Sequence, residues 1–462
     1  MSLELRGLSG VRDCGRFEME KIVNAVEKYR ELILDAEKFI WAHPETGYRE
    51  VETSKYMEDA FESLGYELIR AKDIPGFYTV IDTGRQGPEV LVLGELDAII
   101  CPGHPDADPR TGAVHACGHN AQCAALLGVA AALKEPEVLD RLSGRIRLCA
   151  VPAEELLEIE YRTALKKQGR IRYFGGKSEF LYRGYFDGVD MAFMVHTAHR
   201  FSVNGGSVGC IAKQIVYKGK AAHAGGNPWD GYNALYAANC GLNAANALRE
   251  TFKESDIIRF HPIVTHGGDM VNAIPASAVI ESYVRGRTFE AISNANRRIN
   301  QALSGAALSL NCNVEIVDTP GYAPHLNDEG MKLLSKEAAE RLMPQEEFPM
   351  SDKIGSGSTD MGDLSCVMPI VHPYAAGGEG TAHGSDYRIA DPEKACVMSA
   401  KWQVMMLTLL LENHAGRAKQ ILAAHQPLFD SKEAYFAYVD AISREGDRIE
   451  YREDGTATVS ID

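Results

Sequence analysis

The chain has 462 residues, of which 45% are hydrophobic and 24% charged, and its 64 acidic and 48 basic residues give a formal net charge of −16. This composition is that of a globular protein and excludes disorder, collagen and coiled coil as the main architecture. Because the acidic balance repels polyphosphate backbones and anionic membranes, and we find no local basic patch, we expect neither nucleic acid nor a membrane as partner.

Helices and short apolar strands alternate in the first part of the chain. Apolar residues spaced three and four apart predict a helix over 18–41, and a second helix follows over 51–64. A third helix is predicted over 121–134, and short runs of β-branched and bulky apolar residues predict strands at 76–82, 90–96, 146–151 and 189–195. Because these strands are apolar almost throughout, we expect an α/β fold with a mostly parallel sheet flanked by helices.

The order of elements changes after residue 204. The pattern predicts strand, helix, strand, strand, helix and strand at 208–217, 232–252, 257–264, 278–287, 290–308 and 312–317. This βαββαβ order is typical of a small α/β sandwich. We therefore expect a main domain over 1–204 and 319–462, interrupted by a smaller inserted domain over 205–318.

The remaining chain returns to the main domain and carries few signals of location. Helices are predicted near 329–341 and 394–412, and the last piece, 413–462, is expected to be helical with a β-hairpin. The apolar run Val404–Leu411 is far shorter than the ~20 residues of a membrane-spanning helix, and residues 1–18 lack the apolar run of a signal peptide. With ten scattered cysteines and no C-x-x-C pair, we expect a cytoplasmic protein with mostly reduced, buried thiols.

Polar side chains follow each predicted core strand. Asp97 follows the strand at 90–96, Glu154 and Glu155 follow the strand at 146–151, and His196 follows the strand at 189–195. In open α/β sheets, ligands bind outside the carboxyl ends of the strands. A single histidine after a strand is more often structural, and a Glu-Glu pair is usually a solvated turn, but their coincidence at one sheet edge favours a functional site.

Cys117 and His119 lie on either side of a glycine just before the helix predicted over 121–134. A thiolate and an imidazole at this spacing suit zinc or another first-row metal. The alternative is a buried cysteine beside a histidine that caps the helix. His383, in a glycine-rich loop that begins at Gly377, is the candidate for the remaining ligand, because glycines allow close approach of the backbone.

These motifs occur together in one known family. The chain resembles the M20 family of metallopeptidases and amidohydrolases, and is most similar to the branch with aminobenzoyl-glutamate hydrolase and the N-acyl amino acid amidohydrolases. The resemblance covers about residues 39–406 and is carried by Gly94-Glu-Leu-Asp97-Ala, His115-Ala-Cys-Gly-His119-Asn120, Pro152-Ala-Glu154-Glu155, His196, Gly219-Lys-Ala-Ala-His223-Ala, Val271-Asn272-Ala-Ile-Pro275, Ser358-Thr-Asp360 and His383.

The resemblance implies a homodimeric enzyme with two divalent metal ions per subunit, manganese or zinc, whose first domain is catalytic and whose inserted domain is a lid or dimerisation domain. Glu154 would be the general base, Asp97 would orient a ligand, and His223 would reach the neighbouring subunit's site and help bind the oxyanion. Asn272 and Arg285 would bind substrate, Arg285 through a carboxylate. The implied metal ligands are Cys117, which would bridge the ions, with His119, Glu155, His196 and His383.

The implied reaction is hydrolysis of an amide bond in an N-acyl amino acid, an aminobenzoyl-glutamate-like compound or a dipeptide with a free carboxylate. Two alternatives remain: an inactive member that binds metal or an amino-acid derivative as a sensor or scaffold, and an aminopeptidase, against which Arg285 argues. The chain departs from many relatives at Asn120 and Gln122, where they carry aspartate and histidine, although the asparagine also occurs in the aminobenzoyl-glutamate hydrolase branch. It departs again at an insertion over about 156–174, where relatives usually have a short glycine-rich turn. We expect this insertion to reshape the rim of the pocket.

Overall fold

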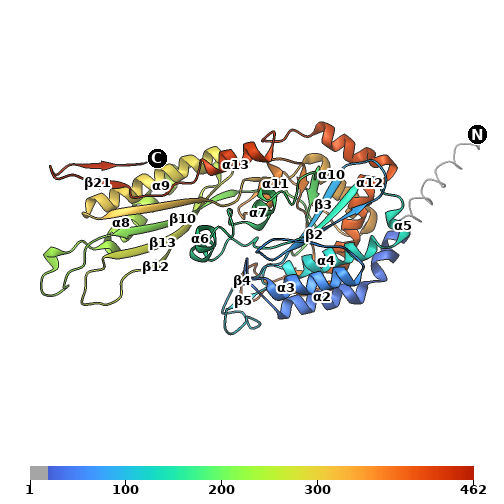
Figure 1. The fold of residues 1–462 in the computed structure, drawn as a ribbon, viewed down its shortest axis with the longest axis horizontal. Coiled ribbons are helices and arrows are strands. Elements are labelled where there is room, and N and C mark those ends of the chain that lie inside the picture. The colour runs from blue at the N-terminus through green and yellow to red at the C-terminus, as the bar shows by residue number, and fades with distance from the viewer. Residues whose placement is uncertain (1–18, 462) are drawn as a thin grey trace, which may run out of the picture.

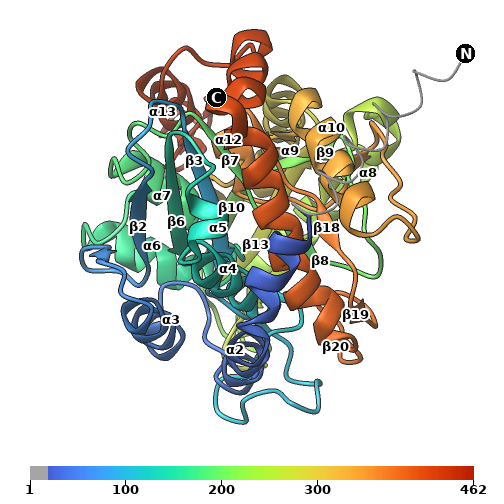
Figure 2. The same ribbon diagram turned by 90° about the vertical axis from the view of Figure 1, so that its right-hand side faces the viewer.

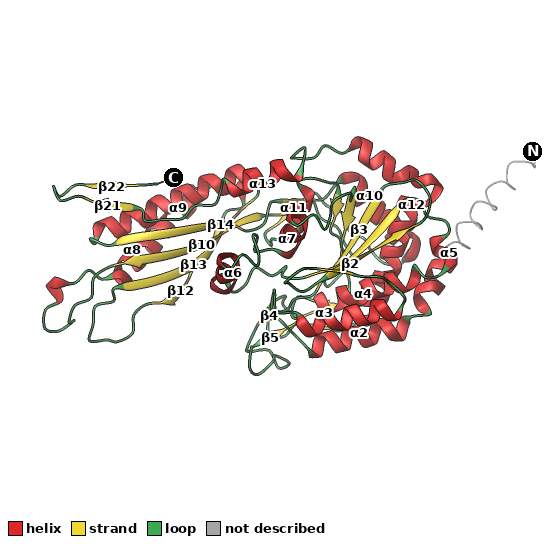
Figure 3. Cartoon of the chain, in the orientation of Figure 1, coloured by secondary structure: helices red, strands yellow, loops and turns green. Residues whose placement is uncertain are grey.

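The computed structural model describes residues 19–461, so residue 18, where the first predicted helix begins, and Cys14 lie outside the described range. The ribbon forms two lobes, each built on its own β-sheet (Figure 1). The larger lobe holds the six-stranded sheet and most helices, and the smaller lobe holds the sheet of the inserted segment, with helices on one side of it (Figure 3).

The central sheet has the strand order β1-β2-β6-β3-β7-β17, with bounds Ile69–Arg70, Phe77–Asp82, Arg145–Val151, Glu89–Glu95, Met191–Phe193 and Ile370–Val371. The neighbours β6, β3, β7 and β17 run parallel, whereas β2 runs antiparallel to β6 and β1. The prediction of a mostly parallel sheet is therefore confirmed. All residues of β3 are buried, as expected for a strand covered on both faces.

Helices cover both faces of this sheet (Figure 2). One layer packs around α4, His119–Ala132, whose residues are all buried, together with α2 (Arg30–Ala42), α3 (Val51–Ser63), α10 (Glu329–Leu342) and α12 (Ser399–Ala424). The second layer consists of α7 (Gly176–Tyr182), α11 (Met361–Ser365) and α13 (Lys432–Asp440). Short helices α5 (Pro136–Leu139) and α6 (Ile159–Lys167) complete this lobe.

The smaller lobe has the predicted βαββαβ order. Its helices are α8, Ala234–Ala247, and α9, Phe289–Ser309, and its strands are β10 (Gly209–Lys218), β11 (Arg259–Phe260), β12 (Ile263–His266), β13 (Ser277–Gly286) and β14 (Asn313–Pro320). These strands pair antiparallel in the order β11-β13-β10-β14, with β12 also beside β13. Burial alternates along β13 and β14, because α8 and α9 cover only one face of the sheet.

Short strand pairs surround the carboxyl edge of the central sheet. They are β4 (Ile99–Ile100) with β5 (Ala113–Val114), β8 (His196–Thr197) with β18 (Tyr374–Ala375), β19 (Gly378–Glu379) with β20 (Arg388–Ile389), and β9 (Gly206–Ser207) with β15 (His325–Leu326) and β16 (Ile354–Gly355).

Two predicted elements are interrupted in the structure. The first helix breaks at Lys28 and Tyr29, whose side chains both donate hydrogen bonds to Glu135. The strand predicted over 257–264 is split into β11 and β12 at Pro262, which has no N–H to donate to the neighbouring strand. Both breaks lie within elements whose type was predicted correctly.

The C-terminal segment runs back along the smaller lobe. Arg444 and Asp447 form bridges to Asp318 and Glu315 of β14, and the hairpin of β21 (Ile449–Tyr451) and β22 (Ala457–Val459) follows. This segment covers the β14 edge of the small sheet (Figure 1). Within residues 19–461, one helical stretch, Glu393–Ala424, is long and apolar enough to cross a membrane, and 89% of its most apolar part is buried inside the structure.

Candidate metal centre

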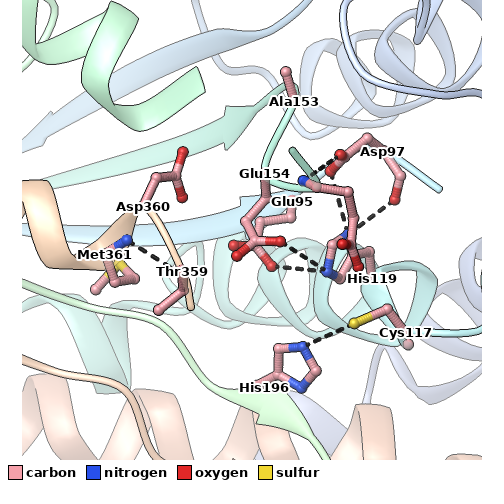
Figure 4. Close-up of polar contacts among 12 residues, drawn as sticks. Glu95, Asp97, Cys117, His119, Ala153, Glu154, His196, Thr359, Asp360 and Met361 are labelled. Atoms are coloured by element: carbon pink, nitrogen blue, oxygen red, sulfur yellow. Dashed lines mark hydrogen bonds and ion pairs between the residues drawn. The ribbon is translucent and has the colours of Figure 1, made fainter. Parts of the chain in front are cut away.

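The carboxyl ends of the parallel strands bring the predicted polar residues to one edge of the central sheet (Figure 4). Asp97 follows β3, the acid pair Glu154 and Glu155 follows β6, and His196 begins β8 just after β7. His119 is the first residue of α4, which packs directly against β3.

Two groups of candidate ligand atoms share Cys117. Its sulfur lies with His119 and His196 in one group and with Glu155 and His383 in another, and within each group the ligand atoms lie within 4.8 Å of one another. The Cys117 Sγ atom is 3.4 Å from His196 Nε2, and His383 Nε2 is 3.0 Å from Glu155 Oε1. Thiolate, imidazole and carboxylate ligands together suit a first-row divalent metal.

Backbone carbonyls and Asp97 fix the orientation of the candidate ligands. His119 Nδ1 lies 2.9 Å from the Asp97 carbonyl oxygen, and His196 Nδ1 lies 2.7 Å from the Thr197 carbonyl oxygen. When these nitrogens donate, each Nε2 atom keeps a free lone pair for an ion, as is common for metal-bound histidines. The Asp97 carboxylate also accepts from the Glu155 N–H at 2.8 Å, so it positions two candidate ligands.

The loop that carries Cys117 depends on a left-handed glycine. Gly118 has φ 86°, and a Cβ atom there would lie 2.5 Å from Tyr387 Oη and 2.9 Å from Thr197 Cβ. His383 also has positive φ, at 64°, and its N–H donates to the Ala116 carbonyl at 2.8 Å. This bond ties the His383 loop to the residue before Cys117.

The carboxylates around His119 favour a positive charge at its Nε2 atom. Its Nε2 atom is buried without a hydrogen-bond partner and lies 3.2 Å from Glu95 Oε2 and 3.9 Å from Glu154 Oε2. A neutral ring with Nδ1 protonated would direct its lone pair at two carboxylates, so either a proton or a metal ion must lie between them. Although burial opposes a charged ring, the charges of Glu95 and Cys117 raise the pKa of His119 well above its usual value.

The charged forms of the other candidate ligands stabilise one another in the same way. Burial and Glu155 act to raise the pKa of Cys117, but His119 and His196 lower it to about 6. Burial likewise opposes ionisation of Glu155, but His383 and His119 lower its pKa to about 2. The hydrogen bonds to Cys117 and Glu155 raise the pKa of His383 to about 11. The cluster therefore favours the thiolate of Cys117 and the carboxylate of Glu155, the forms in which these candidate ligands bind metal, and an ion bound there would displace the protons of His119 and His383.

Glu154 differs from its neighbour Glu155. Its side chain is buried, and burial together with the charges of Glu95 and Glu155 raises its pKa well above the usual value. It lies in a third group with Glu95 and His119, outside both groups that contain Cys117. The two adjacent glutamates thus face different surroundings, one among candidate ligands and one beside them.

Three buried charged residues at this edge were assigned no role from the sequence. Lys177, at the start of α7, has a fully buried side chain that forms ion pairs with Glu95, at 2.5 Å, and with Asp360. Glu95 in turn faces His119. The sequence signal for Glu95 is a carboxylate that ends an otherwise apolar strand, whereas its pairing with Lys177 depends on tertiary structure.

A cavity of about 460 Å³ lies over the metal candidates and between the lobes. Arg285, on β13, lines it and donates to Ser358 Oγ at 3.1 Å. The other residues that line the cavity include Cys117, Glu154, Glu155, Leu156, Leu157, His196, Tyr283, Tyr322, Ser358, Tyr374 and His383. Arg285 therefore shares one cavity with the candidate base and ligands.

His223 and Asn272 do not reach this cavity in the single chain. Both are exposed on the smaller lobe, where His223 forms a bridge to Ala273. The His223 Nδ1 atom accepts hydrogen bonds from the N–H groups of Gly225 and Gly226, which places the ring proton on Nε2. Asn120, the departure next to His119, is buried and donates to Glu37 at 2.8 Å.

The chain matches one family model and several characterised relatives. The model of Peptidase family M20/M25/M40 matches residues 91–407. Xaa-Arg dipeptidase of Mus musculus is 28% identical over 392 residues, which cover 81% of this chain and 83% of that protein. The N-acetyl-L-cysteine deacetylase of Bacillus subtilis is 27% identical over 331 residues, or 68% of this chain and 73% of the relative.

Solved structures share the fold. A putative aminohydrolase from methicillin-resistant Staphylococcus aureus superposes with a TM-score of 0.67 at 21% identity, covering 85% of this chain and all of that one. The YxeP protein of Bacillus subtilis, described as a dinuclear metal binding peptidase from the M20 family, gives a TM-score of 0.60 at 20% identity over 83% of this chain and 99% of its own.

Proposed function

Because this chain belongs to peptidase family M20/M25/M40 and is a metal-dependent hydrolase of amide bonds, we propose that its substrate is a small amide with a free carboxylate. The proposed substrate class is an N-acyl amino acid, an aminobenzoyl-glutamate-like compound or a dipeptide. The observation that carries this proposal is a pair of ligand groups sharing Cys117 beside Glu154, in a cavity that Arg285 also lines.

We propose two divalent ions, manganese or zinc, with Cys117 between them, since its sulfur belongs to both ligand groups. His119 and His196 would hold one ion, and Glu155 and His383 would hold the other. Bound there, such ions polarise the amide carbonyl and lower the pKa of water toward ~7. The dinuclear description of YxeP supports this arrangement.

Glu154 would move the proton. Its carboxylate lies outside both ligand groups and within 3.9 Å of His119 Nε2, so it is close to the ions without being needed to hold them. A carboxylate in this place can take a proton from the attacking water and pass it to the leaving amine. The buried surroundings that raise the pKa of Glu154 also favour the protonated carboxyl that forms when it takes this proton.

Arg285 would bind the substrate carboxylate. We expect Arg285→Gln to lower kcat/KM about 10–100-fold, mainly through KM, because a hydrogen bond to a charged group contributes about 1.5–3 kcal/mol. Arg287→Gln, an exposed arginine beyond the same strand, is the matched control. The measurement compares kcat/KM for an N-acyl amino acid with kcat/KM for the same compound in which the free carboxylate is replaced by a carboxamide. If the variant still prefers the substrate with the free carboxylate as strongly as the wild type does, Arg285 does not bind this carboxylate.

Two copies would form the active enzyme. The exposed edge strand β12 carries Ile263 and Val264, 62% and 48% exposed, and large apolar side chains on the same lobe are exposed at Trp229, Tyr236, Met270 and Val271. The opposite edge, β14, is covered by the C-terminal segment, so β12 is the edge left for pairing. We propose a homodimer through this surface, in which His223 and Asn272 serve the partner's site.

The test of the function is amine release from a panel of N-acyl amino acids, aminobenzoyl-glutamate and dipeptides. We expect hydrolysis to be lost after treatment with a chelator and restored by Mn²⁺ or Zn²⁺. No metal-dependent release across the panel would favour a binding protein that acts as a sensor or scaffold.

The nine free cysteines within residues 19–461 support the proposed cytoplasmic location.

A further inference from the structure

The insertion after the acid pair forms a structural element at the junction of the two lobes. Its helix α6, Ile159–Lys167, lies where the lobes meet (Figure 1). Leu156 and Leu157 line the cavity, and the Leu156 carbonyl accepts a hydrogen bond from the hydroxyl of Tyr283 on the smaller lobe. The insertion therefore contacts both lobes as well as the site.

Arg162 of this helix reaches back to the acid pair. Its side chain is 1% exposed, and its guanidinium donates to the carbonyls of Phe174 at 2.7 Å, Ala153 at 3.5 Å and Glu155. One planar cation thus joins the residue before Glu154 and the residue after it to the end of the insertion. Lysine has no comparable fork of fixed donors.

Other buried side chains hold the rest of the same backbone. The Ala153 N–H donates to Glu50 Oε1 at 2.7 Å, the Glu154 carbonyl accepts from the Tyr322 hydroxyl, and the Glu155 N–H donates to Asp97. Ala153 has φ 58°, a left-handed conformation that persists only when its surroundings impose it. The direction in which Glu154 and Glu155 project is therefore set by side-chain bonds to their backbone.

We propose that Arg162 is a positioning residue that holds Glu155 in place as a metal ligand and Glu154 in place as the proton carrier. The proposal rests on the proposed function for Glu154, whereas its effect on Glu155 can be measured through metal binding alone. Without the guanidinium, the carbonyls of Ala153 and Glu155 would lose buried donors, and the acid pair would be free to shift.

The test compares Arg162→Met and Arg162→Lys with Lys167→Met, which removes an exposed cation from the same helix. For each folded variant, Mn²⁺ affinity is measured by calorimetry, kcat and KM by amine release, and amide hydrogen exchange over residues 153–157 by mass spectrometry. All are measured well below the variant's own unfolding temperature, so that lost global stability does not contribute.

We expect Arg162→Met to weaken Mn²⁺ binding and lower kcat about 10–100-fold each, with little change in KM, and to speed exchange over 153–157. For Arg162→Lys, Mn²⁺ affinity, kcat and exchange should lie between the values of Arg162→Met and the wild type. If Arg162→Met does not fold, Arg162→Lys is the variant that decides the test. Wild-type Mn²⁺ affinity, kcat and exchange in both folded Arg162 variants, with only stability reduced, would show a structural role and overturn the proposal. If the wild type hydrolyses nothing on the panel, the proposed function fails, and Mn²⁺ affinity and exchange still decide the role of Arg162.

Discussion

Glu154→Gln is expected to lower kcat by about 10²–10⁴-fold while the protein retains its metal. The amide keeps the size and most contacts of the side chain but cannot accept the proton of the attacking water. Metal content should be unchanged, because Glu154 lies outside both ligand groups that contain Cys117. The measurement is single-substrate kinetics together with elemental analysis of the purified variant.

Two matched variants make this result specific. Glu160→Gln, an exposed glutamate on α6, should behave as the wild type. Glu155→Gln should lose both metal and turnover, because Glu155 lies with Cys117 and His383 in one ligand group. If Glu154→Gln retains wild-type kcat, the proton is carried by another group. If it loses metal as Glu155→Gln does, Glu154 is a ligand.

The strand ends show how much of the site the sequence could predict. Continuous apolar runs indicate buried parallel strands, and parallel strands bring their carboxyl ends to one edge, so the residues that follow β3, β6 and β7 are found together. The fold class followed from the same patterns, whereas the family was identified from the resemblance of the motifs that carry these residues, which the family model over residues 91–407 confirms. The ligand roles at this edge agree with the geometry but remain predictions until a metal is bound.

Contacts between distant segments could not be predicted in this way. Lys177, Glu95 and Asp360 meet only because α7 and the residue before α11 close over the end of β3, and no local pattern encodes that ion pairing. The sequence predicted an insertion over 156–174, but the hydrogen bonds of Arg162 to the acid pair depend on how α6 packs. The interruption of the strand at Pro262, in contrast, could have been predicted from the sequence, because proline has no N–H to donate to a neighbouring strand.

His223→Ala is expected to lower kcat by about 10²–10³-fold, the usual effect of removing a donor to an oxyanion, with metal content unchanged. In the single chain, His223 is exposed on the smaller lobe and does not line the cavity that holds the metal candidates. Because Nδ1 accepts from the N–H groups of Gly225 and Gly226, the ring proton lies on Nε2, which is the atom that can donate to an oxyanion. A large effect of so exposed a residue on turnover alone would therefore mean that His223 reaches a site in one of two ways, either that of its own chain after the lobes move or that of a partner subunit.

Mixing His223→Ala with Glu154→Gln distinguishes the two possibilities. If His223 serves the partner's site, each mixed dimer contains one intact site, formed by Glu154 of one chain and His223 of the other. Random exchange of equal amounts should then restore about a quarter of wild-type activity, since half of the dimers are mixed and each has one working site. If His223 serves its own subunit, both sites of a mixed dimer carry a defect. Mixed dimers confirmed by native mass spectrometry that show no recovery would refute the shared site, and Ile263→Lys on the exposed β12 edge should abolish both dimerisation and recovery.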